Sequence, residues 1–317
     1  MQPGENQPHL VLMSRPFPLP ALTAGGRPIT FLHWQPGTTP PPGPEAFITA
    51  AIDPVPAALI AQFPKSLGLI ANLGVGTDNI DRNAARARGL LVSNTPVVTE
   101  DTADLCLALM LAACRRVGQN ERFLRQNLWS AHRPNAVLGT SLGGKTLGII
   151  GFGAIGQAVA RRAAGFDMLP VYTGPSRKQN SESRSGAEFE PNLDTLLARA
   201  DIVTLHCPLT QATQHLLNAA RLAKLKPGAV IINTGRGALI DEQALVAALQ
   251  SGQVGAAGLD VFENEPSVSP ELLAMEQVVL TPHIGSATAE CRAAVVRRGL
   301  ANLVNFLETG SVIDPVR

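Results

Sequence analysis

The chain has 317 residues, more than one domain usually contains, so we expect two domains that each bury a core. Its 26 basic and 25 acidic side chains leave a net charge of +1. Lys and Arg are not concentrated in the kind of stripe that binds a phosphate backbone, which excludes nucleic acid as an expected partner.

The chain shows no sign of secretion, membrane insertion or metal binding. Residues 1–8 are polar and lack the basic and apolar regions of a secretory leader. The longest strongly apolar segment, residues 105–114, is short of the roughly 20 residues that cross a bilayer. Four cysteines are scattered without Cys-x-x-Cys spacing: Cys106, Cys114, Cys207 and Cys291. We therefore expect a cytoplasmic protein with reduced cysteines, no metal and no membrane partner.

The first part of the chain alternates short β-rich runs with Ala- and Leu-rich helical stretches, which indicates βαβ units and a parallel sheet. The predicted strands are residues 9–13, 46–50, 67–72 and 90–93. The proline-rich residues 35–44 interrupt this series as a surface loop. Residues 100–125 then have apolar positions at helical spacing and predict one long helix that bridges two lobes.

A second series of strands predicts a complete dinucleotide-binding sheet of six parallel strands. These strands are residues 145–150, 169–172, 202–206, 229–233, 255–260 and 278–281. Pro170 lies inside the second of them, where it removes a donor from the ladder. Residues 287–307 follow as another helix, and the tail 312–316 is short enough to return to the first lobe.

Three glycines mark the expected nucleotide site. Gly151, Gly153 and Gly156 follow a predicted strand and precede a good helix, with Ala154 and Ile155 between them. In this context the first two glycines allow a tight turn and a close approach of backbone to pyrophosphate, and the third allows close helix–strand packing. The phosphates then face the positive end of the helix.

The loop after the next strand indicates which nicotinamide cofactor binds. NAD-binding proteins usually carry an acid there for the ribose 2′-hydroxyl, but residues 172–178 contain none. Ser176, Arg177 and Lys178 can instead bind a 2′-phosphate, unless they form only a solvated basic loop. We expect NADP(H) as the preferred cofactor, with NAD(H) possible.

Three titratable residues in the last third of the chain suggest the chemistry. Arg236, Glu265 and His283 each follow a predicted strand, and ligands bind at the carboxyl ends of such strands. An always-charged guanidinium can bind the carboxylate of a 2-oxo acid. An imidazole can donate a proton, and a carboxylate can hold its ring and favour its charged form. Taken singly, each could be a turn cap, a loop acid or a surface histidine; their coincidence favours a dehydrogenase. Removing Glu265 should move a pH optimum more than it abolishes binding.

The chain resembles the D-isomer-specific 2-hydroxyacid dehydrogenase family over nearly its whole length. The motifs that carry the resemblance are Gly151-Phe-Gly-Ala-Ile-Gly156, His206-Cys-Pro-Leu209, Asn233-Thr-Gly-Arg-Gly237, Gly258-Leu-Asp-Val-Phe262, Glu265-Pro266 and Thr281-Pro-His-Ile-Gly-Ser-Ala-Thr288. The resemblance implies that Arg236, Glu265 and His283 are catalytic, with His283 as acid/base, and that Asp260 lies by the nicotinamide amide. The other cofactor contacts that we expect are Thr102, Cys207, Pro208, Thr213, Thr234, Gly235, Arg236, His283 and Gly285.

The family's architecture implies an α/β protein of two Rossmann-like domains, one flavodoxin-like and one dinucleotide-binding, with parallel sheets and a cleft between them. Residues 1–97 plus 287–317 would form the substrate domain and 98–286 the dinucleotide-binding domain. Backbone amides of Val75 and Gly76 would hold the substrate carboxylate together with Arg236 and His283. The resemblance also implies a homodimer, to which the region around Trp129 contributes, as interface packing or by reaching the partner's active site.

Within the family, the Gly74-Val-Gly-Thr-Asp78 segment and the Ser-Arg-Lys loop look most like NADPH-preferring reductases. We expect NADPH-dependent reduction of a small 2-oxo acid, glyoxylate or hydroxypyruvate, to the D-2-hydroxy acid. The alternatives are 2-ketogluconate or hydroxyphenylpyruvate reduction, and a non-catalytic NAD(P)H-sensing protein, against which the catalytic trio argues. An enzyme based on Cys207 is disfavoured because His206 would face the other side of the strand.

Overall fold

The computed structural model describes residues 7–130, 132 and 137–316. The chain divides into two compact units at Val98 and again at Ser286. We call residues 1–98 with 287–317 the outer unit and residues 99–286 the central unit. The first division lies one residue beyond the expected position.

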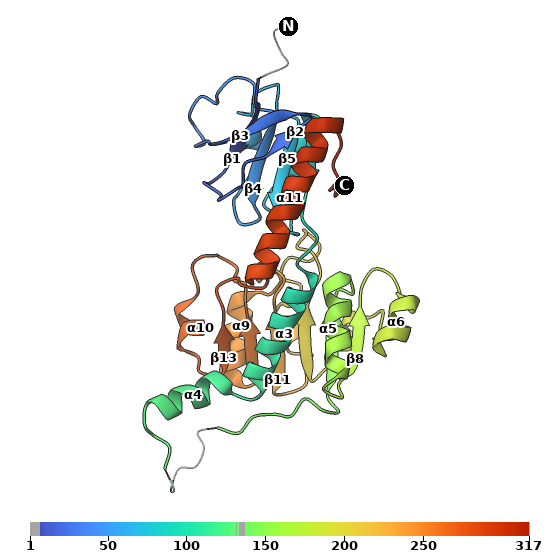
Figure 1. The fold of residues 1–317 in the computed structure, drawn as a ribbon. Helices are drawn as coiled ribbons and strands as arrows, with labels where there is room; N and C mark the ends of the chain where they lie inside the picture. Colours follow the sequence, from blue (N-terminus) through green and yellow to red (C-terminus); the bar gives the residue numbers. More distant parts are fainter. Residues whose placement is uncertain (1–6, 131, 133–136, 317) are drawn as a thin grey trace. The chain divides into compact units, whose positions relative to one another are not determined.

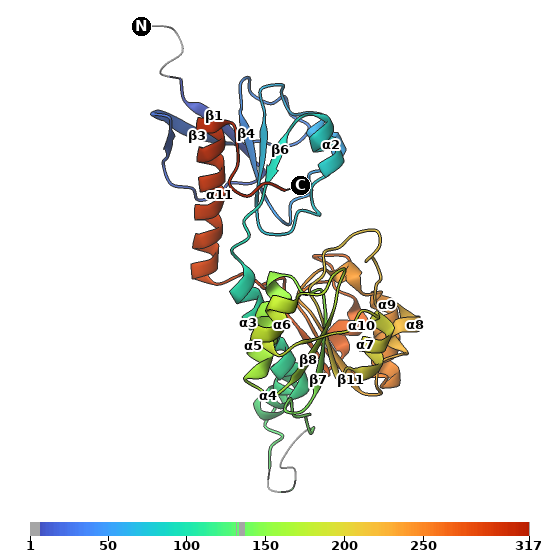
Figure 2. The same ribbon diagram turned by 90° about the vertical axis from the view of Figure 1, so that its right-hand side faces the viewer.

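The outer unit is a six-stranded sheet with helices on both faces. The strand order is β2-β3-β1-β4-β5-β6, with β1 His9–Met13, β2 Thr23–Ala24, β3 Arg27–His33, β4 Ala46–Ala50, β5 Leu69–Leu73 and β6 Leu91–Ser93. The long helix α11 (Ala289–Thr309) covers one face, and α1 (Ala57–Ile60) and α2 (Arg82–Ala87) cover the other (Figure 2). The C-terminal helix thus belongs to the same unit as the first strands.

Two strands of this sheet were not predicted, and one of them makes the sheet mixed. β2 pairs with β3 in the antiparallel direction, whereas the other pairs are parallel. β3 lacks a continuous apolar run because most of its residues are exposed or half-buried at the sheet's edge region. Such a strand gives little hydrophobic signal. The expected α/β architecture is confirmed, and the sheet of the outer unit is parallel except for the pair β2–β3 at its edge.

The central unit is a seven-stranded parallel sheet between two layers of helices (Figures 1 and 2). The strand order is β13-β12-β11-β10-β7-β8-β9, with β7 Thr146–Ile150, β8 Leu169–Thr173, β9 Glu188–Phe189, β10 Ile202–Leu205, β11 Ala229–Asn233, β12 Val254–Leu259 and β13 Val278–Leu280. All six predicted strands are present. The two-residue β9 was missed because it is too short for a periodic pattern.

Helices from different parts of the chain cover the two faces of this sheet. One layer contains α3 (Thr99–Cys114) and α5 (Ala154–Ala164), with α6 (Gln179–Ser185) beside α5. The other layer contains α7 (Leu193–Arg199), α8 (Ala219–Leu222), α9 (Glu242–Ser251) and α10 (Pro270–Ala274). Strand order reverses between β7 and β10, which makes the carboxyl ends of these two strands the expected place for a ligand.

The predicted long helix over residues 100–125 is two helices. α3 ends at Cys114 and α4 spans Val117–Arg125, because Arg116 between them has left-handed backbone with φ +53°. The guanidinium of Arg116 donates to the carbonyl oxygen of Gly255 at 2.9 Å. Apolar spacing continues through the break, so the sequence pattern alone did not reveal it.

Pro170 does lie inside β8, and the ladder tolerates it. On the β7 side of the strand, the amide of Leu169 donates to the carbonyl of Lys145, and the carbonyl of Thr173 accepts from the amide of Gly151. On the β9 side, the carbonyl of Tyr172 accepts from the amide of Glu190. Alternation along the strand therefore turns the nitrogen of Pro170 toward β9, whose pairing begins only at Val171. The amide that Pro170 lacks would therefore point to a position that β9 does not reach, so no ladder hydrogen bond is lost.

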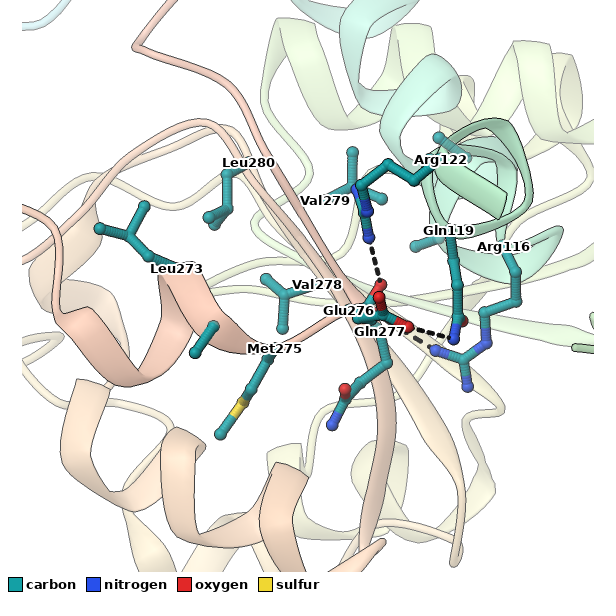
Figure 3. Close-up of a pocket in the computed structure, with 14 residues that line it drawn as sticks. Arg116, Gln119, Arg122, Leu273, Met275, Glu276, Gln277, Val278, Val279 and Leu280 are labelled. Atoms are coloured by element: carbon teal, nitrogen blue, oxygen red, sulfur yellow. Dashed lines mark hydrogen bonds between the residues drawn. The ribbon is translucent and has the colours of Figure 1, made fainter. Parts of the chain in front are cut away.

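A hollow of about 520 Å³ lies on the central unit between α3, α4 and the segment from α10 to β13 (Figure 3). Gln119 donates to a carboxylate oxygen of Glu276 at 2.8 Å, and Arg122 lies beside the Glu276 backbone. None of the predicted site residues lines this hollow. Within the described ranges, no helix combines the length and the apolar character needed to cross a membrane.

Candidate active site

The turn that carries Arg236 is fixed by the side chain of the last residue of β11. Asn233 is buried; its Oδ1 accepts from the amide of Gly235 at 3.0 Å, and its Nδ2 donates to the carbonyl of Arg236 at 2.8 Å. Gly237 follows in close contact with another turn, since a Cβ there would lie 1.9 Å from the carbonyl carbon of Phe262. The Arg236 turn is thus packed directly on the segment that leads to Glu265.

His283 is placed by the buried carboxylate of Asp260, the residue after β12. One oxygen of Asp260 accepts from the Thr281 hydroxyl at 2.6 Å and the Ile284 amide at 2.8 Å, and the other accepts from the Gly285 amide at 2.8 Å. Burial raises the pKa of Asp260, although these donors act in the opposite direction. The carboxylate therefore organises the turn in which His283 takes left-handed backbone, with φ +52°.

Glu265 and His283 form a direct pair. Oε2 of Glu265 lies 2.7 Å from Nδ1 of His283, and its Oε1 accepts from the amide of Phe262 at 3.0 Å. Burial alone would raise the pKa of Glu265, but the bonds from His283 and Phe262 and the charges of His283 and Arg236 together hold it below its ordinary value. The central unit thus brings the three predicted catalytic residues together.

A side-chain hydrogen bond ties the loop after β10 to the loop that carries Glu265. Nε2 of His215 lies 2.5 Å from Oε1 of Glu263, and the His215 amide donates to the carbonyl of Ala238 at 2.8 Å. His215 therefore contacts both the segment after Arg236 and the segment before Glu265. Sequence reasoning missed this residue because it lies well beyond the end of its strand.

The glycine motif forms an open cradle at the point where strand order reverses. Gly151 has φ +95°, and a Cβ there would lie 2.5 Å from the amide nitrogen of Cys207. Gly156 packs closely on the Gly151 carbonyl, whereas a Cβ at Gly153 would have no heavy atom within 4 Å. Free backbone at the N-terminus of α5 is the environment that a pyrophosphate needs, so these residues fit a dinucleotide.

Other predicted cofactor contacts lie in α3 and in the loops that follow β10, β11 and β13. The loop after β10 is closed by Thr213, whose hydroxyl donates to the Pro208 carbonyl at 2.7 Å. Thr102 of α3 lies beside Gly285, where a Cβ would be 3.6 Å from the Thr102 methyl. Thr234 is buried in the turn after β11.

The predicted 2′-phosphate loop is paired with an acid from the following helix, α6, which spacing did not reveal. Arg177 donates from Nε to Oε1 of Glu182 at 3.0 Å and from Nη2 to Oε2 at 2.9 Å. Glu182 also accepts from the hydroxyl of Tyr172 at 2.7 Å. The acid comes from α6, after the loop, so inspection of residues 172–178 alone could not find it.

The structure disfavours an enzyme based on Cys207, because His206 is not placed to act as its base. Burial raises the pKa of Cys207 to about 11 and lowers the pKa of His206 to about 4, which keeps both groups neutral at pH 7. Nε2 of His206 lies 2.9 Å from the hydroxyl of Thr204 and 3.8 Å from the sulfur of Cys106. His206 therefore points to α3 and the core.

In the outer unit, the predicted carboxylate-binding turn has its carbonyl groups occupied. Asn94 donates to the carbonyl of Val75 at 2.8 Å, and Asn72 donates to the carbonyl of Gly76 at 2.7 Å. The amides of Val75 and Gly76 donate to no other group in the described part of the chain. Trp129, after α4, is 64% exposed and belongs to none of these clusters.

Comparison with known proteins gives a family match and close relatives. Residues 107–285 match the family model described as D-isomer specific 2-hydroxyacid dehydrogenase, NAD binding domain. A glyoxylate reductase from Thermococcus litoralis is 45% identical over 267 residues, which cover 83% of this chain and 80% of that protein.

Solved structures agree over nearly the full length. The chain is similar to an NADPH-dependent glyoxylate/hydroxypyruvate reductase from Sinorhizobium meliloti in complex with NADP and malonate, with a TM-score of 0.87, 33% identity and coverage of 98% of this chain and 96% of that one. It is also similar to a glyoxylate reductase from Paecilomyes thermophila, with a TM-score of 0.85, 34% identity and 98% of both chains covered.

Proposed function

Because this chain belongs to the D-isomer-specific 2-hydroxyacid dehydrogenase family, we propose that it uses NADPH to reduce a small 2-oxo acid, glyoxylate or hydroxypyruvate, to the D-2-hydroxy acid. It is a dehydrogenase with an NAD-binding domain in its central unit. The observation that carries the proposal is the Glu265–His283 pair beside Arg236, at the carboxyl ends of neighbouring strands of a dinucleotide-binding sheet.

His283 acts as the proton donor in this proposal. Glu265 engages Nδ1 and so leaves Nε2 of the imidazole for the carbonyl oxygen of a 2-oxo acid. A protonated imidazole donates to that oxygen as negative charge develops on it, and Glu265 stabilises the imidazolium before the proton is given up. A bound reduced nicotinamide supplies the hydride.

We propose that Arg236 of the central unit binds the substrate carboxylate. The guanidinium of Arg236 is planar and always charged, which suits a forked contact with a carboxylate. In the outer unit taken by itself, the backbone amides of Val75 and Gly76 are the donors proposed for a carboxylate, and no hydrogen bond within the described residues engages them.

Two observations support NADPH as the preferred cofactor. The loop after β8 contains Ser176, Arg177 and Lys178, which can hydrogen-bond and neutralise a 2′-phosphate. A similar solved structure is described as NADPH-dependent and was determined with NADP. The residues proposed to hold the cofactor are those gathered at the reversal of strand order: the glycine cradle, Ala154 and Ile155, and the Cys207–Thr213 loop. Thr102, Thr234, Gly235, Asp260 and Gly285 complete the set.

The proposed oligomer is a homodimer that uses the hollow beside α4. Large apolar side chains are exposed around this part of the chain, which is unusual for a surface that stays solvated. They are Val117, Leu124, Leu128, Trp129, Leu138 and Leu273. Light scattering should give the mass of two chains, and Leu273→Glu should give the mass of one; a monomeric wild type would contradict the proposal.

We further propose that the enzyme works in the cytoplasm, where thiols stay reduced. The four cysteines are free in the structure, and three of them are buried. Labelling of the cysteines in rapidly quenched cells would check this, since an oxidised pool would contradict it.

The test of the function is the initial rate of NADPH oxidation, with NADH in parallel, on glyoxylate, hydroxypyruvate, hydroxyphenylpyruvate and 2-ketogluconate. We expect the highest kcat/KM with NADPH and one of the two small acids. A preference for either larger acid would keep the chemistry but replace the substrate. Cofactor binding without turnover of any of the four would favour the sensor.

A further inference from the structure

The end of β8 carries a closed network around Glu182. Tyr172 is buried, its hydroxyl donates to Glu182, and it also accepts from the backbone amide of Lys178 at 2.6 Å. Arg177 donates to both oxygens of the same carboxylate. The Glu182 side chain is 14% exposed and that of Arg177 is 57% exposed. The acid is therefore held in the interior of the network and the guanidinium on its outside.

This network is attached to the glycine cradle. The ring of Tyr172 stacks on that of Phe152, which lies between Gly151 and Gly153, with centroids 3.8 Å apart and an interplanar angle of 14°. α6, which carries Glu182, is also bound to α5, since the Ser181 hydroxyl donates to Gln157 at 2.9 Å. In a doubly wound sheet, the loop after this strand faces the adenosine ribose of a dinucleotide in the cradle.

The charge at this loop is smaller than its sequence indicates. Arg177 and Lys178 supply two positive charges, and Glu182 removes one of them. Its contact with Arg177 is a fork, the geometry in which a guanidinium would otherwise bind a phosphate. Near a 2′-phosphate, the carboxylate also repels the ligand directly.

We propose that Glu182 is a specificity-determining residue that limits the preference for NADPH over NADH by neutralising Arg177. This inference rests on the proposed function, because it requires a nicotinamide dinucleotide in the cradle. Glu182 supplies from α6 the negative charge that NAD-binding proteins usually place at the strand end. Its pairing with Arg177 leaves a site able to accept either cofactor.

The test separates the charge of Glu182 from its positioning role. Glu182→Gln removes the charge and keeps one acceptor oxygen, in place of Oε1, for Tyr172 and for Nε of Arg177; the amide nitrogen replaces Oε2, so the bond from Nη2 of Arg177 is lost. A matched control is Glu188→Gln, because Glu188 forms a similar fork with Arg199, at 2.8 Å for both bonds, beyond the cofactor loop. Dissociation constants of NADPH and NADH, and of 2′,5′-ADP and 5′-AMP, are measured by calorimetry on the full chain.

We expect Glu182→Gln to tighten NADPH and 2′,5′-ADP about three- to tenfold relative to NADH and 5′-AMP, the size that one partly screened charge gives. Glu182→Ala should change the ratio in the same direction, and Glu188→Gln should leave it unchanged. If Glu182→Gln leaves the ratio unchanged while Glu182→Ala weakens NADPH, Glu182 only orients Arg177 and the proposal is overturned.

The same experiment separates this inference from the proposed function. A wild type that binds both cofactors, with an unchanged ratio in Glu182→Gln, contradicts only the inference. A wild type that binds neither cofactor contradicts both. A wild type that prefers NADH contradicts the NADPH assignment, and a gain of NADPH affinity in Glu182→Gln then still supports the role of Glu182.

Discussion

Two loop regions at the carboxyl edge of the central sheet hold their charges in different ways. In the turns after β11, β12 and β13, backbone groups and buried polar side chains fix the charged residues: Asn233 holds the Arg236 turn, and Asp260 holds the His283 turn. In the loop after β8, the charged side chains of Arg177 and Glu182 mainly hold each other. The turns after β11, β12 and β13 fix the positions of their charged residues, whereas in the loop after β8 the charge of Glu182 offsets that of Arg177.

The difference corresponds to what each region is proposed to do. Proton transfer and carboxylate binding need fixed distances, and buried hydrogen bonds supply them. Discrimination between cofactors is a difference of affinities, and one counter-charge can adjust it without movement of the backbone. Changes in the first region should therefore reduce turnover, whereas changes in the second should alter a ratio of affinities.

The largest effect is expected when the proton donor is removed. His283→Gln should lower kcat about 10²- to 10⁴-fold with much smaller changes in cofactor affinity, because general acid catalysis contributes that much. Steady-state kinetics on glyoxylate, with NADPH binding measured separately, would check this. His33→Gln is the control, since His33 is exposed in the outer unit. An unchanged kcat would remove His283 from the mechanism.

Gly237→Ala tests whether close packing of two turns supports the site. A Cβ there would lie 1.9 Å from the Phe262 carbonyl carbon, so the Arg236 and Glu265 turns must separate. We expect kcat/KM to fall about 10²-fold, the cost of misplaced catalytic groups. Gly143→Ala should be harmless, because its nearest contact would be 3.7 Å. Equal activity of the two variants would show that the turns move freely.

At the same edge of the sheet, burial keeps His206 in its neutral form. Its folded-state pKa of about 4 lies below the ordinary 6.5, so between these values the unfolded chain binds a proton that the folded chain does not. Stability from this group is therefore complete above pH 6.5 and is lost as the pH falls toward 4.

Between pH 7 and pH 5 the wild type should lose about 2 kcal/mol more unfolding free energy than His206→Gln. Urea unfolding across this range measures the two slopes, which is more informative than either absolute stability because the substitution also changes packing. Equal slopes for the two proteins would show that His206 binds the same number of protons in the folded chain as in the unfolded chain.

Glu265→Gln should have the smallest effect on rate. The pKa of Glu265 is below its ordinary value, so its carboxylate is charged throughout the neutral range, and its Oε2 holds Nδ1 of His283 at 2.7 Å. Without that contact the imidazole is less well oriented, and we expect kcat/KM on glyoxylate to fall about tenfold. An unchanged kcat/KM would show that Glu265 does not position His283.

The sequence predicted that the candidate catalytic residues follow neighbouring strands of the central sheet, because its signals there are local. Each of Arg236, Glu265 and His283 follows a β-rich run, and parallel strands bring such positions to one edge. The strands of the central unit were predicted for the same reason. The break at Arg116 and the strand β3 were missed, because a left-handed residue and an exposed strand leave the apolar pattern unchanged.

Glu182 and His215 could not be assigned from spacing. Each reaches its partner from a neighbouring element, α6 in one case and the loop after β10 in the other. Their significance depends on the direction of a side chain in the folded unit. Sequence reasoning that found no acid at the end of β8 was correct for residues 172–178 and incomplete for the folded loop.

Pro170 has a consequence for association of the folded chain. Edge strands with regular unpaired amides can add a strand from another molecule, which is how aggregation of β-sheets begins. β9 covers only Val171 and Tyr172, so part of β8 borders the open side of the sheet. At this position Pro170 offers no amide to an incoming strand, which disfavours intermolecular strand addition.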